Sequence, residues 1–180
     1  MINHIKEDRM VGMLAEIIAL EYGVPPSMAR QIRTAAFLHD IGKQRISHSI
    51  LSKPGKLNTQ EFDMIKMHTL LGAEMLTSIQ GSLGVMARAC CLFHHEWHNG
   101  GGYFGVRTEY LPFYVPFVAI SDVWAALVCE RPYKQAWPLN EAMHYIQNKA
   151  GTQFNPELVE VFLNLIRSDS RVSALFTRWG

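Results

Sequence analysis

The stretch VPFVAISDVWAALVC, residues 115–129, is a long apolar run that contains a single charged residue, Asp122. It follows Pro112 and stops before Arg131-Pro132, so its length and composition predict a buried helix. A lone carboxylate inside so apolar a helix loses a large hydration free energy. Asp122 therefore needs a cation, a hydrogen-bond network or a raised pKa, and this need marks it as a candidate functional residue.

Apolar residues recur at helical spacing along most of the chain, which predicts six further helices around this run. The seven predicted helices span about residues 10–22, 27–40, 59–76, 83–93, 113–130, 141–149 and 156–167. Asn58 with Glu61 forms a candidate capping box, and Asn155 with Pro156 is typical of a helix start. Residues 42–57 and the glycine-rich residues 97–112 are predicted to be loops. We expect an all-α, single-domain helical bundle over residues 1–180, without a separate sensory or receiver domain.

Composition excludes several classes of protein. Of the 180 residues, 48% are apolar and 18% are charged, whereas a disordered tail or a coiled coil needs far more charge. Lys and Arg total 17 against 16 Asp and Glu, so there is no field of one sign to hold nucleic acid or an anionic membrane. We find no signal peptide, and no apolar run is long enough to span a membrane. A soluble, cytoplasmic protein with reduced cysteines is expected.

Histidines and carboxylates with helical, mainly apolar surroundings are the main candidates for a site. They are His39, Asp40, His68, His94, His95 and Asp122. Imidazole nitrogens together with carboxylate oxygens suit a hydrolytic divalent-metal or iron site. The alternative is that a backbone carbonyl satisfies each histidine. That explains any one of them, but it does not account for all of them together with Asp122.

Five blocks of sequence occur in an order and spacing that resemble a known family. They are AAFLHDIGK (35–43), IKMHTLLGAEML (65–76), HHEWHNGGGYF (94–104), ISDVWAALVCERPYK (120–134) and GTQFNP (151–156). Over about residues 7–165 they resemble the HD-GYP branch of the HD-domain metal-dependent phosphohydrolases. The resemblance implies a helical bundle of the HD-domain type with two or three metal ions, often iron or manganese. It also implies hydrolysis of cyclic di-GMP to pGpG.

The same resemblance assigns roles by position. The implied metal ligands are His39, Asp40, His68, His94, His95 and Asp122, with Glu7 on the first helix. Asp40 would bridge two ions and share the catalytic role with Lys43, which falls near the scissile phosphate. Tyr103, Arg131 and Lys134 fall where the family holds substrate phosphates. Without the family, Lys43 could equally be loop charge, and Arg131 with Lys134 could cap a helix C-terminus.

Several positions depart from the family pattern. Phe104 replaces the proline of the Gly-Tyr-Pro motif, which removes a residue that stiffens the loop. Asn99 and Ala125 each replace an aspartate, and Ala125 cannot accept a hydrogen bond with its side chain. On the first helix, Glu7 stands where the family often has a His ligand, and Asn3 stands where three-metal members have Glu. We therefore expect two divalent ions rather than three.

Three functions stay open at this level. The first is a cyclic di-GMP phosphodiesterase in which a dinuclear metal centre activates water. The second is a general HD nucleotide phosphohydrolase acting on nucleoside monophosphates or guanosine polyphosphates. The third is a catalytically degenerate HD-GYP-like module that binds or signals. The expected partners are a cyclic dinucleotide or other nucleotide substrate, and either a second copy in a homodimer or a separate regulatory chain.

Overall fold

The computed structural model describes residues 2–130 and 135–172. These residues are largely helical and contain no strand, only an isolated bridge between Ala150 and Phe154. Within them, the seven longer helices are α1 (Ile2–Glu21), α2 (Pro26–Phe37), α4 (Thr59–Met75), α5 (Gly81–Phe93), α6 (Val115–Val128), α7 (Leu139–Asn148) and α8 (Pro156–Ser168). The expected all-α bundle of about seven helices is confirmed.

Capping residues define two helix starts as the sequence predicts. The Asn58 side chain accepts a hydrogen bond from the Glu61 N–H at 2.8 Å, and the Glu61 carboxylate accepts one from the Asn58 N–H at 2.9 Å. The Asn155 side chain accepts from the N–H of Glu157 at 2.8 Å at the start of α8. These bonds satisfy backbone donors that a helix start leaves without a partner in the helix.

The predicted loops are wrong in part. Residues 42–57 include most of a 3-10 helix, η1 (Ile41–Arg45), and a short helix, α3 (His48–Leu51). Residues 97–112 include a second 3-10 helix, η2 (Thr108–Tyr110), and α1 begins at residue 2 rather than near residue 10. One or two turns of helix are too short to show an apolar period, so hydrophobic patterning cannot detect them.

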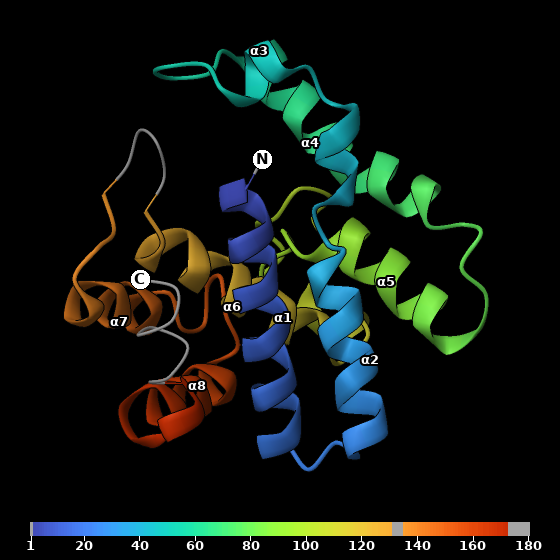
Figure 1. Cartoon of the computed structure of the whole chain (residues 1–180). Helices are drawn as coiled ribbons and strands as arrows, with labels where there is room; N and C mark the ends of the chain where they lie inside the picture. The colour runs from blue at the N-terminus through green and yellow to red at the C-terminus, as the bar shows by residue number, and fades with distance from the viewer. Residues whose placement is uncertain (1, 131–134, 173–180) are drawn as a thin grey trace.

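The helices pack around α1 and α6. In Figure 1, α1 and α2 lie side by side as an antiparallel pair, α6 packs against α1, and α5 packs against α2 and α4. The helices α7 and α8 lie on the side of α6 away from α5. Trp124 of α6 and Phe162 of α8 are among the largest fully buried side chains, and their ring centroids are 5.4 Å apart. In the part of the chain described, no helix combines the length and apolarity needed to cross a bilayer.

A close backbone approach positions η1 against α4. A Cβ atom on Gly42 would lie 1.9 Å from the carbonyl oxygen of His68 and 2.5 Å from the nitrogen of Gly72. Glycine is therefore required at position 42, because any side chain would push η1 away from α4. The approach also brings His39 and Asp40, which directly precede η1, close to His68.

We predict that Gly42→Ala lowers the free energy of unfolding by at least about 1–3 kcal/mol, the usual cost of overpacking. Urea denaturation followed by circular dichroism measures this. Gln44→Ala is the matched control, since Gln44 lies in the same 3-10 helix and is exposed. Equal unfolding midpoints for Gly42→Ala and the wild type would contradict the close approach.

Candidate metal centre

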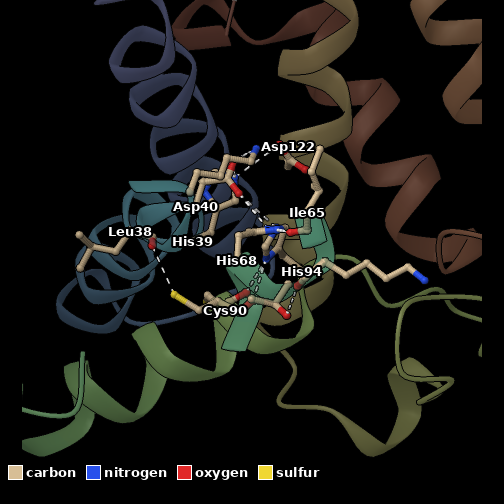
Figure 2. A network of polar contacts seen from close by, with 12 residues as sticks. Leu38, His39, Asp40, Ile65, His68, Cys90, His94 and Asp122 are labelled. Carbon is tan, nitrogen blue, oxygen red and sulfur yellow. Dashed lines mark hydrogen bonds and ion pairs between the residues drawn. The ribbon is translucent and has the colours of Figure 1, made fainter. Parts of the chain in front are cut away.

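Four segments that are distant in sequence bring their polar side chains to one place. His39 and Asp40 come from the turn between α2 and η1, His68 from α4, His94 and His95 from the C-terminal end of α5, and Asp122 from α6. Figure 2 shows the labelled side chains of this set pointing toward one another. His39, His68 and His94 are almost completely buried.

Asp40 lies at the middle of the set. Its Oδ1 atom is 3.2 Å from Nε2 of His68 and 3.7 Å from Nε2 of His94. Its Oδ2 atom is 3.4 Å from Nε2 of His39 and also contacts the ammonium group of Lys43. One carboxylate thus faces three imidazoles and a lysine.

The backbone determines which ring nitrogen of each histidine faces inward. In His39, His68 and His94, Nδ1 lies 2.7, 2.6 and 2.8 Å from a backbone carbonyl oxygen of the preceding turn. A carbonyl can only accept, so each Nδ1 donates its proton and each Nε2 faces the centre, where a neutral ring presents a lone pair. Backbone carbonyls therefore do satisfy these histidines, but only at one nitrogen, and this arrangement is typical of histidines that bind metals.

The histidine Nε2 atoms and the Asp40 carboxylate that face the centre are arranged as the ligands of a cation would be. Nε2 of His68 and Nε2 of His94 are 3.4 Å apart, although both are acceptors. Nε2 of His39 and Oδ1 of Asp40 are buried and have no hydrogen-bond partner among the described residues. Acceptors that face one another in a buried site repel unless positive charge lies between them. The donor chemistry is that of a divalent transition-metal site.

The donors form three overlapping groups in which the ligand atoms lie within 4.8 Å of one another. The groups are Asp40 with His68, His94 and His95; His39 with His94 and Asp122; and Asp8 with His39 and Asp40. Because the groups share Asp40, His39 and His94, they form one extended set of ligands rather than separate sites.

On the first helix, the structure brings Asp8 beside the other donors, and the metal role predicted for Glu7 stays a prediction. Glu7 is buried, but its carboxylate belongs to none of the three groups, whereas that of Asp8 does. Burial raises the pKa of Asp8 to about 6, and the nearby His39 opposes this shift. Asp8 continues the buried stripe of Val11 and Ala15 by one turn, a signal that the sequence already contained.

The electrostatics of the centre favour positive charge. Burial raises the pKa of Asp40, but His39 and Lys43 outweigh it and hold that pKa well below its usual range. Burial likewise raises the pKa of Asp122, and His39 again reverses the effect. Burial lowers the pKa of His39, yet Asp40 and Asp122 hold it well above its usual value. The carboxylates therefore stay ionised and stabilise positive charge among them, which is either a protonated His39 ring or a bound cation that replaces its Nε2 proton.

The two histidines at the end of α5 are held neutral. Burial lowers the pKa of His94 well below its usual value, and it lowers that of His95 to about 4. The neutral imidazole is the form that binds a metal ion, so these rings need not lose a proton near neutral pH before binding one.

Two of the predicted catalytic and substrate-binding residues lie at the edge of the centre. Lys43 contacts Asp40, and the ring centroid of Tyr103 is 4.4 Å from that of His95. Burial raises the pKa of Tyr103 to about 12, so its phenol stays protonated and can donate a hydrogen bond. Arg131 and Lys134 lie outside the described residues, and their roles stay predictions.

Comparison with known proteins identifies the family. The HD-domain family model matches residues 3–158. The chain is 39% identical over 156 residues to a cyclic di-GMP phosphodiesterase of Thermotoga maritima. This match covers 86% of the chain and 42% of that protein. The chain is 37% identical over 151 residues to the cyclic di-GMP phosphodiesterase response regulator RpfG of Xanthomonas campestris, covering 83% and 40%. It is 36% identical over 154 residues to 3'3'-cGAMP-specific phosphodiesterase 2 of Vibrio cholerae, covering 85% and 30%.

The chain thus spans less than half the length of these relatives.

Solved structures share the fold at lower identity. Bd1817, an HDG"Y"P protein from Bdellovibrio bacteriovorus, matches with a TM-score of 0.71 and 16% identity over 90% of this chain and 52% of that chain. The HD domain of the L. monocytogenes phosphodiesterase PgpH in complex with cyclic-di-AMP matches with a TM-score of 0.63 and 19% identity, over 98% and 92%. The chain belongs to the HD-domain family, and its resemblance to the HD-GYP branch is confirmed.

Proposed function

We propose that the chain is a metal-dependent phosphodiesterase that hydrolyses a cyclic dinucleotide, with cyclic di-GMP as the first candidate. The observation that carries the proposal is the buried Asp40 carboxylate among inward-facing histidine nitrogens, which fits a hydrolytic metal centre. The names of the matched relatives, which include cyclic di-GMP and 3'3'-cGAMP phosphodiesterases, support the substrate class. That residues 1–180 form a single catalytic domain is part of this proposal.

Two divalent ions, iron or manganese, would be held with Asp40 between them. His68, His94 and His95 with Asp40 would hold one ion, and His39, Asp122 and Asp8 with Asp40 would hold the other. When bound, such ions supply Lewis acidity and lower the pKa of a coordinated water, which makes hydroxide available near neutral pH.

The remaining roles belong to side chains at the edge of the centre. Lys43, next to Asp40, places a positive charge where a phosphodiester would lie and would stabilise the charge that develops on its oxygens. Tyr103 would donate a hydrogen bond from its phenol to a phosphate oxygen, because burial raises its pKa to about 12 and keeps the phenol protonated. Arg131 and Lys134 are proposed to hold the substrate phosphate that is not being cleaved.

Substrate specificity tests the proposal directly. We expect protein reconstituted with manganese or iron to hydrolyse cyclic di-GMP or 3'3'-cGAMP with a kcat/KM at least about tenfold above that for linear nucleotides. Chromatographic product analysis on a panel with nucleoside monophosphates and guanosine tetraphosphate measures this. Hydrolysis of the linear nucleotides alone would favour a general HD nucleotide phosphohydrolase. Tight binding without product, in metal-loaded protein, would favour a binding module.

Loss of the bridging carboxylate is expected to remove metal and activity together. Asp40→Asn keeps the side-chain shape but removes the charge that balances the cations. We expect about two ions per chain in the wild type, fewer in Asp40→Asn, and a fall in kcat greater than the roughly 100-fold that lost outer-shell contacts cause. Elemental analysis and turnover measure this, with the exposed Asp63→Asn as control. Unchanged metal content in Asp40→Asn would contradict the assignment.

The charge of Lys43 should matter for turnover but not for metal binding. Lys43→Gln is expected to lower kcat by about 100-fold, the order seen when one donor to a developing oxyanion is removed, with metal content unchanged. The control is Lys53→Gln, which removes a lysine that pairs with Glu61. Full turnover by Lys43→Gln would show that Lys43 is ordinary loop charge.

A further inference from the structure

Glu96 follows the two metal-site histidines and is buried, with 2% of its surface exposed. Its two carboxylate oxygens accept hydrogen bonds from the N–H groups of Phe104 and Val106, each at 2.7 Å. These are short, charge-assisted bonds to backbone donors, which compensate for burying the carboxylate. They tie the glycine-rich loop after α5 to the residue that follows His95.

The backbone of the same loop crosses directly over this residue. A Cβ atom on Gly102 would lie 2.4 Å from Cα of Glu96 and 2.5 Å from the carbonyl oxygen of His95. Only glycine fits there without moving the chain. Tyr103 is therefore held on both sides, by the crossing at Gly102 and by the Glu96 bond to Phe104, and its ring lies 4.4 Å from that of His95.

We propose that Glu96 is a positioning residue whose carboxylate holds Tyr103 beside the metal centre. We call the Glu96 carboxylate with the N–H groups of Phe104 and Val106 the loop clamp. The inference rests on the proposed function, in which Tyr103 binds substrate. Phe104 is essential to the clamp because proline, the residue of the family motif at this position, has no N–H to donate. The chain thus holds its loop by a bond that the motif residue could not make.

The first test compares two substitutions at one position. Phe104→Pro removes the N–H, whereas Phe104→Ala keeps it and removes only a side chain that is 44% exposed. With cyclic di-GMP as substrate, we expect Phe104→Pro to raise KM roughly tenfold, the order of a lost hydrogen bond to a charged group, while kcat and metal content change little. Phe104→Ala should have a KM near that of the wild type. Equal KM values for the two variants would overturn the proposal.

The second test asks whether Glu96 acts through Tyr103. Glu96→Gln keeps the shape of the side chain but can accept only one of the two bonds with its single oxygen. We expect it to raise KM in the wild-type background and to have no further effect in a Tyr103→Ala background. Additive effects in this double-mutant cycle would show that Glu96 acts on the whole fold, and would contradict a positioning role.

A third measurement needs no substrate. Hydrogen exchange at the amides of Phe104 and Val106 should be slow in the wild type and at least about tenfold faster in Glu96→Gln. Equal exchange rates in the two proteins would show that the clamp is absent. If Glu96→Gln fails to fold, the exchange rate of the Val106 amide is compared between Phe104→Pro and Phe104→Ala instead. Faster exchange in Phe104→Pro would support the clamp, and equal rates would contradict it. If the wild type hydrolyses no cyclic dinucleotide, the proposed function fails, but the exchange rates still test the clamp.

Discussion

Asp40 lies 3.2 Å from Nε2 of His68 and 3.4 Å from Nε2 of His39, and each of those histidines donates its other ring proton to the backbone. A carboxylate and several lone pairs cannot share a buried space unless positive charge lies among them. Lys43, which contacts Asp40, supplies part of this positive charge. Together with His39 it holds the pKa of Asp40 well below its usual range. A metal ion is the group that meets it with the donor types present.

The bundle serves this centre by holding donors that are far apart in sequence at rigid places. Gly42 lets η1 approach α4 so closely that the His39-Asp40 turn lies beside His68. The apolar helix α6 anchors Asp122 through neighbours such as Trp124, which is fully buried. Rigid placement matters because a hydrolytic site works only when its charges already face the position of the reacting phosphate.

The departures from the family pattern have different structural consequences. The Asn99 side chain accepts a hydrogen bond from the N–H of Gly101 at 2.9 Å, so it still shapes the glycine turn without a charge. Ala125 is buried in α6 and contributes packing alone. The loss of proline at position 104 suggested a looser loop, but in the structure the Phe104 N–H is bonded to Glu96.

The sequence by itself determined the longer helices and the main donor types. Apolar periodicity and caps such as Asn58 with Glu61 are local signals, and a carboxylate inside the apolar run around Asp122 is costly wherever that run packs. Only the tertiary structure decided that the Asp8 carboxylate lies beside His39 and Asp40, and that the Glu96 carboxylate accepts hydrogen bonds from the loop of Tyr103. The reason is physical: these relations depend on which backbone and side-chain atoms of distant segments become neighbours, and no local pattern specifies that.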